Sequence, residues 1–201
     1  MRGAFLYLTF ISLLCGAWVN SYSNSKRDLN AVPQETDITP EEAFDLMMKV
    51  LMSPRCLNCH PSGDRPTQGD DLHIHYYNVQ RGPNNRGAGI QQCQSCHQNS
   101  NNYYTGVPGA SNWHLAPKSM GWQGLTKIEI AKIILDQSKN GGIGLDSLVT
   151  HLTNDSKVLW AFDPGINQEG VPRSLPPVAK ETYIEAVKIW AENGAPIPND
   201  D

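Results

Sequence analysis

The stretch CLNCH at residues 56–60 and the stretch CQSCH at residues 93–97 decide the fold of this chain. Each stretch places two cysteines three positions apart and a histidine directly after the second cysteine. Zinc sites, disulfide bridges and covalent haem attachment all use paired cysteines, but only haem attachment requires the adjacent histidine. In haem attachment the two thiols add across the porphyrin vinyl groups, and the histidine ligates the iron. The rest of the sequence has to distinguish zinc binding, disulfide bridges and haem attachment.

The first residues, MRGAFLYLTFISLLCGAWVNS, have the order of an export signal, with one positive charge, an apolar run and then polar residues. We therefore predict a signal peptide over residues 1–22, which places the remainder of the chain in the periplasm or otherwise outside the cytoplasm. Two alternatives stay open. Cys15 stands where a lipoprotein signal has its lipidated cysteine, although the bulky Leu14 before it fits such a signal poorly. The apolar run is also close to the length of a membrane span, so a retained N-terminal anchor is the second alternative.

Once Cys15 is set aside, all cysteines of the chain belong to the two motifs. A zinc site would leave both motif histidines unexplained and fits an exported protein poorly. Disulfides suit an exported protein, but they need no histidine after each pair. We therefore predict two covalently bound haem c groups, and a zinc- or disulfide-stabilised binding module remains the alternative. The predicted attachment residues are Cys56, Cys59, Cys93 and Cys96, and the predicted proximal iron ligands are His60 and His97.

The charge balance excludes nucleic acid as a partner. The chain has 16 Lys and Arg against 20 Asp and Glu, a net charge of −4 with histidine neutral, and no dense basic cluster. A surface that binds nucleic acid needs clustered positive charge to neutralise phosphates. The mild acidity itself indicates only a soluble domain.

The remaining sequence predicts helices separated by long irregular segments. Residues 23–38 are polar and without periodic hydrophobicity, which predicts a tether. Residues 61–92 and 98–124 are rich in Gly, Pro, Asn and Asp and show no alternation of period two, so we expect loops there and no strands. Hydrophobic periodicity and capping signals predict four helices: one starting at Pro40 behind Thr39 and stopping before Ser53, one from Thr126 to Gly141, one over residues 145–152, and one over about 178–193 with Gly194 after it.

The spacing of the motifs predicts how the haems share the chain. The motifs are 37 residues apart, which is too few for each haem to have a class I cytochrome domain of its own. Irregular segments of this length also need a cross-link or a cofactor to order them. The predicted fold class is therefore mainly α with long irregular segments, as a single dihaem cytochrome c domain over residues 39–198 after the N-terminal signal segment.

Four histidines outside the motifs are candidate sixth ligands for the irons. We prefer His75, between the motifs, and His114, shortly after the second motif, as distal ligands. The alternatives are His73, His151 and Met120. Further side chains are expected in the core (Met47, Met48, Met52), against the porphyrins (Trp113, Trp122, Trp160, Trp190), and either solvated or beside haem propionates (Arg65, Arg81, Arg86, Arg173).

Several phrases of the chain resemble one family. They are QGDDLHIHYYNVQRGP at 68–83, CQSCHQ at 93–98, PGASNWHLAPKSMGWQGL at 108–125, KNGG at 139–142, LVTHL at 148–152 and LWAFDPG at 159–165. The family is a group of small exported dihaem cytochrome c proteins labelled as subunits of isoquinoline 1-oxidoreductase-like enzymes, and the resemblance covers about residues 56–195. It implies a haem electron carrier that works with a molybdenum hydroxylase. The chain itself has no pattern for molybdopterin or an iron–sulfur cluster, so the substrate would belong to the partner.

Two functions from different classes follow. The first is electron transfer from a dehydrogenase with both irons six-coordinate, for which the surplus of histidines provides ligands. The second is a dihaem enzyme such as a peroxidase, in which one iron keeps an open position next to an acid or base. No motif in the chain identifies such an acid or base, so we expect the electron carrier rather than the enzyme.

Overall fold

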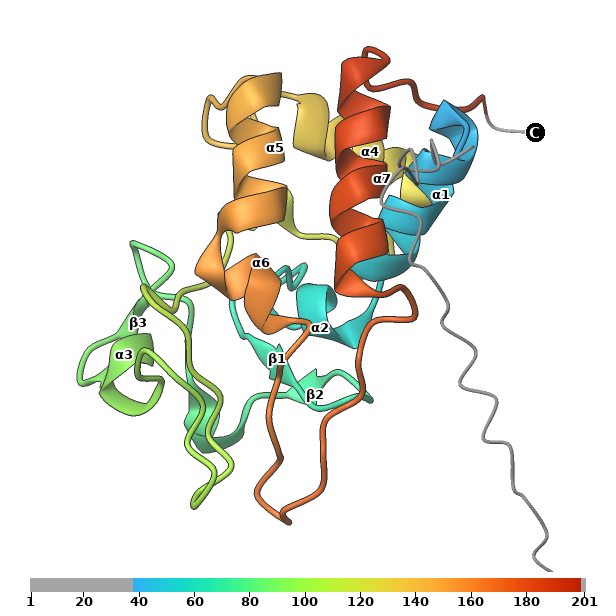
Figure 1. The fold of residues 1–201 in the computed structure, drawn as a ribbon. Coiled ribbons are helices and arrows are strands. Elements are labelled where there is room, and N and C mark those ends of the chain that lie inside the picture. The colour runs from blue at the N-terminus through green and yellow to red at the C-terminus, as the bar shows by residue number, and fades with distance from the viewer. Residues whose placement is uncertain (1–37, 200–201) are drawn as a thin grey trace, which may run out of the picture. The chain divides into compact units, whose positions relative to one another are not determined.

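The computed structural model describes residues 38–199, in which helices and loops alternate (Figure 1). About 39% of the described part is helix and 7% is strand. The helices of four or more residues are α1 (Pro40–Leu51), α2 (Pro54–Leu57), α3 (Cys93–Cys96), α4 (Lys127–Leu135), α5 (Leu145–Asn154), α6 (Ser156–Trp160) and α7 (Lys180–Glu192). Two 3-10 turns, η1 (Tyr76–Asn78) and η2 (Lys118–Met120), and four short strands complete the elements. All of these elements belong to one compact unit.

Two helices begin at the capping boxes that the sequence predicts. At α1, Thr39 Oγ1 accepts a hydrogen bond from the backbone of Glu42 at 3.2 Å, and the Glu42 carboxylate accepts one from the Thr39 backbone at 3.0 Å. Thr126 and Glu129 repeat this exchange at α4, at 3.2 and 2.8 Å. Each box satisfies backbone N–H groups that the first helical turn leaves without partners.

The predicted ends of the helices are less accurate. The helix that starts behind Thr126 ends at Leu135 and not at Gly141. Asn140 causes the early end, because its buried amide donates to the carbonyls of Ile134 and Ile143 at 2.9 and 3.0 Å and folds the chain back. The third and fourth predicted helices are confirmed as α5 and α7.

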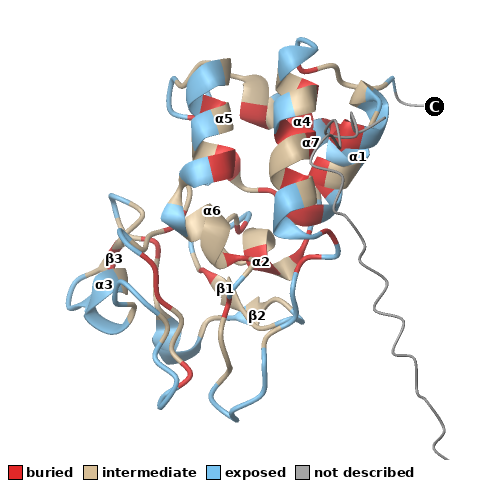
Figure 2. Ribbon diagram, in the orientation of Figure 1, coloured by how far each residue is buried: buried red, intermediate tan, exposed pale blue. Residues whose placement is uncertain are grey.

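The hydrophobic core lies between α1 and α7, and α5 packs against α7 (Figures 1 and 2). Phe44, Met47, Tyr183 and Trp190 are fully buried there. Met48 is buried as predicted, but the prediction for Met52 is wrong, because Met52 is 41% exposed. It caps the end of α1, where the chain leaves the helix and turns its side chain away from the core.

The expectation of no strands is also wrong. β1 (Thr67–Gln68) pairs with β2 (His73–Ile74), and β3 (Gly87–Ala88) pairs with β4 (Gln91–Gln92), both antiparallel. Two residues per strand cannot show an alternating pattern, so periodicity gives no signal for them. The first hairpin carries His73, and the second leads directly into α3 and the second cysteine motif.

Replacing Thr126 with alanine tests the capping box of α4. We expect the free energy of unfolding to fall by about 1 kcal/mol, because the N–H of Glu129 loses its acceptor. Denaturant titration followed by circular dichroism measures this. The matched control is Ser147→Ala on the exposed side of α5, which should change the stability by less than about 0.5 kcal/mol. An equal effect of both substitutions would contradict a role of the cap.

The predicted signal peptide, Cys15 and all but the last residue of the predicted tether lie outside the described residues. Among the helices of residues 38–199, none is long and apolar enough to cross a membrane.

Candidate functional site

Both cysteine motifs fold as a single helical turn. In the first, the backbone N–H of Cys59 and that of His60 donate to the Cys56 carbonyl at 3.0 and 3.1 Å. In the second, His97 donates to the Cys93 carbonyl at 2.9 Å. Such a turn brings two side chains three positions apart to the same side of the helix. The thiols of each pair and the following imidazole are thus presented together.

One segment of the chain, residues 108–123, holds both motif histidines. His97 donates from Nδ1 to the Pro108 carbonyl at 2.8 Å and stacks on Trp113, with ring centroids 4.7 Å apart and planes 8° apart. His60 donates from Nδ1 to the Met120 carbonyl at 2.7 Å and stacks on Trp122, at 3.5 Å and 12°. A carbonyl at Nδ1 fixes the tautomer and leaves the Nε2 lone pair free for a metal. The two motif histidines therefore have the same arrangement of carbonyl, ring and indole.

Burial sets the protonation of the motif side chains. It lowers the pKa of His60 to about 3 and that of His97 to about 4, so both imidazoles are neutral at pH 7. It raises the pKa of Cys56 to about 12 and that of Cys59 to about 11, so both thiols are protonated. The Cys93 thiol of the second motif also contributes to the raised pKa of Cys59, after burial.

The other four histidines share the orientation of the motif histidines. Their Nδ1 atoms face an oxygen: the Asp71 carboxylate for His73 at 2.6 Å, the Tyr76 carbonyl for His75 at 2.8 Å, the Asn112 carbonyl for His114 at 2.5 Å and the Asp155 carboxylate for His151 at 3.4 Å. Throughout residues 38–199, no Nε2 of a histidine takes part in a hydrogen bond. All six imidazoles thus keep available the nitrogen that a metal would bind.

A cavity of about 230 Å³ adjoins the first motif. Cys56, Cys59 and His60 line it together with His114 and His151, and most of the other lining residues are apolar. Burial is the main cause of the low pKa of His60, and the charge of His151 contributes to it. His151 is carried by α5 and His114 by the loop after the second motif, and both line the cavity with His60.

Met120 lines the same cavity, and its side chain is buried. Its carbonyl, however, binds Nδ1 of His60. The backbone of Met120 therefore lies at the end of the ring away from Nε2, and this placement favours a role in orienting His60 over a role as a sixth ligand.

The second motif has its partner in His75. The ring centroids of His75 and His97 are 6.0 Å apart, with planes at 72°. Two imidazoles on opposite sides of one metal ion have centroids ~6 Å apart, since each metal–nitrogen bond is about 2 Å and each nitrogen lies about 1 Å from its ring centre. Gln91, which precedes the motif, donates to the Tyr77 carbonyl at 2.8 Å and ties the His75 loop to this site. His73 lies in the same loop but pairs with Asp71.

Several large hydrophobic and aromatic side chains in the segments before and after the second motif are exposed. Ile90 is 95% exposed and Tyr104 is fully exposed, and Ile74, Tyr76, Tyr77 and Tyr103 are each more than half exposed. A porphyrin attached to Cys93 and Cys96 would cover those of them that lie next to it.

These observations fit haem at both motifs: paired thiols on one turn, a neutral imidazole with a free Nε2, and apolar surroundings. The four motif cysteines carry free thiols. In the described part of the chain, no three His, Cys, Asp or Glu side chains converge to hold a metal ion. Neither a zinc cluster nor a disulfide is therefore present among residues 38–199.

The arginines near the first motif differ from the prediction. Arg81, expected to be solvated or beside a propionate, is buried and donates to the carbonyls of Ala116, Pro61 and Gly63. It thus clamps the loop that follows the first motif. Arg55 was missed, although its position directly before Cys56 was a signal: a charged residue there must lie beside the thiols. It is buried and lines the first cavity.

The structure places three of the four candidate tryptophans near the motif histidines and the fourth in the hydrophobic core. Trp113 and Trp122 stack on the motif histidines, and Trp160 packs edge-on against Trp113 with centroids 5.0 Å apart. Trp190 instead lies in the core of α1 and α7, and its indole donates to the Pro196 carbonyl at 2.8 Å. Trp190 is therefore a residue of the hydrophobic core and does not stack on either motif histidine.

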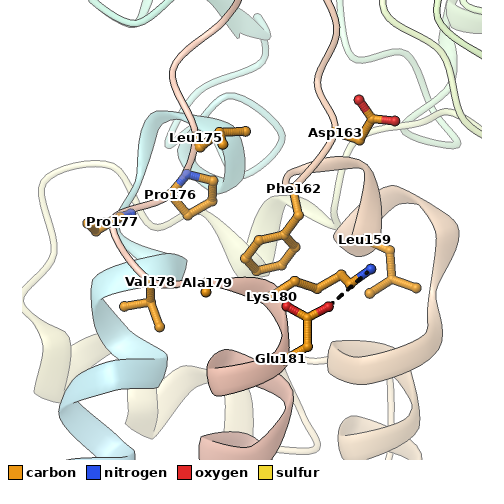
Figure 3. A pocket seen from close by; sticks show the side chains of 10 residues that line it. All are labelled: Leu159, Phe162, Asp163, Leu175, Pro176, Pro177, Val178, Ala179, Lys180 and Glu181. Carbon is orange, nitrogen blue, oxygen red and sulfur yellow. Dashed lines mark ion pairs between the residues drawn. The ribbon is translucent and has the colours of Figure 1, made fainter. Parts of the chain in front are cut away.

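A second cavity, of about 430 Å³, lies at the start of α7 (Figure 3). Phe162, Leu175 and Pro176 give it an apolar wall, and Lys180 and Glu181 form an ion pair of 3.6 Å at its edge. Its lining residues include neither cysteine nor histidine. It therefore offers neither a thiol for haem attachment nor an imidazole for a haem iron, and the functional site is assigned to the two motifs.

Comparison of the chain with protein-family models, with curated proteins and with solved structures finds no match. The geometry of the two motifs therefore carries the functional argument.

Proposed function

We propose that this protein is an exported dihaem c-type cytochrome that transfers electrons. One haem c is attached through Cys56 and Cys59 and the other through Cys93 and Cys96. The observation that carries the proposal is the shared environment of the two motif histidines, each with Nδ1 bonded to a carbonyl and its ring stacked on an indole. A zinc site made of the four cysteines, or disulfides between them, would give these histidines no role.

The sixth ligands we propose are His75 for the second iron and His151 for the first. The separation of 6.0 Å between the rings of His75 and His97 supports the first assignment. For the second, His151 lines the first cavity and acts on the pKa of His60. Burial raises the pKa of Asp155, but hydrogen bonds from His151 and Lys157 lower it overall. The His151 imidazole therefore has a carboxylate, that of Asp155, as its partner at Nδ1. Such a partner increases the basicity of a ligating histidine.

Two histidines per iron favour an electron carrier over a peroxidase. Bound haem supplies one-electron redox chemistry. Histidine side chains on both sides leave no open position for a substrate, whereas a peroxidase needs one. Trp113 stacks on His97 while its neighbour His114 lines the cavity of the first motif. This dipeptide thus connects the two sites, which supports electron exchange between them.

The partner we propose is a redox protein, and the resemblance noted in the sequence suggests a molybdenum hydroxylase-type dehydrogenase as the electron donor. The cytochrome would operate in the periplasm or an equivalent exported compartment, where covalent haem attachment takes place. Any contact with the membrane would be made by the N-terminus.

The test is an optical series on the protein matured with the cytochrome c assembly machinery: oxidised, reduced, and reduced under carbon monoxide. We expect a c-type spectrum, two haems per chain by pyridine haemochrome analysis, and no change on adding carbon monoxide. A change in part of the haem would show an open iron and favour the peroxidase. A colourless protein after maturation would overturn the proposal.

A further inference from the structure

This inference rests on the proposed function and concerns Arg55, the residue directly before the first motif. The Arg55 side chain is 2% exposed, which is rare for an arginine. It forms an ion pair with Asp70, whose side chain is 53% exposed, and donates to the Gly69 carbonyl at 3.3 Å. Arg55 is thus a buried cation in the wall of the first cavity. In the described part of the chain its only carboxylate partner is Asp70, which is exposed to water.

Both hydrogen bonds of the guanidinium come from one nitrogen, Nη2. Its Nε is buried and has no hydrogen-bond partner in the described part of the chain. A buried N–H without an acceptor destabilises a fold, so such groups are normally satisfied. Arg55 lines the cavity together with Cys56 and Cys59, and both thiols act on its pKa. The unsatisfied donor therefore belongs to a residue next to the predicted thioether bonds.

The cavity holds one other cation among its lining residues, and it is already paired. Lys157 also lines the cavity, but its ammonium group contacts the Asp155 carboxylate at 3.1 Å. Arg55 is the lining cation with a donor left over. Each haem carries two propionates, and a propionate oxygen would be an acceptor for this donor. An arginine binds carboxylates through directed N–H groups in a fixed plane.

We propose that Arg55 binds a propionate of the haem at the first motif through Nε and that the Arg55–Asp70 pair sets the reduction potential of that iron. The two residues act with opposite sign. A positive charge near the iron stabilises the reduced state and raises the potential, and a negative charge lowers it. The effect should be larger at the first haem than at the second, because Arg55 lines the cavity of the first motif and the interaction between charges weakens with distance.

The experiment is a redox titration of the matured full-length chain, resolved into two one-electron components. Arg55→Gln should lower the reduction potential of one component by at least about 59 mV, which is a tenfold change in its reduction equilibrium. The potential of the other component should not change. Arg55→Lys, which keeps the charge, should shift the affected component less. Asp70→Asn should shift the same component upward. The matched control is Lys127→Gln, which breaks an exposed ion pair with Asp45 and should move neither component.

Unshifted components in variants that carry two haems would overturn the inference, as would shifts of equal sign in Arg55→Gln and Asp70→Asn. If Arg55→Gln does not fold, Asp70→Asn still tests the inference through the potential of the first haem. Asp70 is half exposed, so this substitution should leave the core intact. Absence of haem from the unsubstituted protein would be a failure of the proposed function instead.

Discussion

Replacing Cys93 and Cys96 together with serine is expected to leave one haem per chain instead of two. Each motif supplies both thioether bonds of its own haem, so loss of one pair removes one porphyrin. The second motif lies on α3, where Cys96 is exposed, and the main packing partner of α3 is β4 rather than a core helix. The helical core and the first site should therefore persist. Intact mass and pyridine haemochrome analysis measure the loss, which we expect to halve the haem content.

The reciprocal variant, with Cys56 and Cys59 replaced by serine, should also retain one haem but be less stable. Cys56 packs against the hydrophobic core, and a hydroxyl there is a buried polar group. Asn99→Ala, at an exposed position after the second motif, is the control and should keep both haems. Two haems in either double variant, or none in the first, would show that the motifs do not each hold one haem.

What could be predicted from the sequence depends on local chemistry. The capping boxes at Thr39 and Thr126 need only residues three positions apart, and both are present. The cysteine motifs need only five adjacent residues, and they fold as the single turns that haem attachment requires. Each of these signals is complete within one helical turn, so no tertiary contact can hide it.

What the sequence did not reveal depends on contacts between distant residues. Asn140 ends α4 by binding carbonyls on both sides of a turn, and Arg81 is buried because three loop carbonyls converge on it. The same holds for ligand pairing. His114 is closer to the second motif in sequence, yet it lines the cavity of the first. His151 reaches that cavity only because α5 packs on α6 and α7.

Alanine at His75 and alanine at His151 are each expected to open a different iron to carbon monoxide. His75 faces His97, with ring centroids 6.0 Å apart, so His75→Ala should make the second haem five-coordinate. His151 and His60 line the same cavity, so His151→Ala should do the same to the first haem. In each variant about half of the reduced haem should bind carbon monoxide, and in the double variant nearly all of it, because carbon monoxide takes an iron position that no side chain occupies.

His114→Ala is the matched control, because His114 lines the same cavity as His151 and also has its Nδ1 bonded to an oxygen. It should leave both haems unreactive. If His114→Ala opens the first iron and His151→Ala does not, the ligand of the first iron is His114, which the sequence favours as a distal ligand without assigning it to an iron. If neither does, the irons are not ligated by these side chains, and Met120 becomes the next residue to replace. The single-haem variant lacking Cys93 and Cys96 sharpens this comparison, because every change in its spectrum then belongs to the first iron.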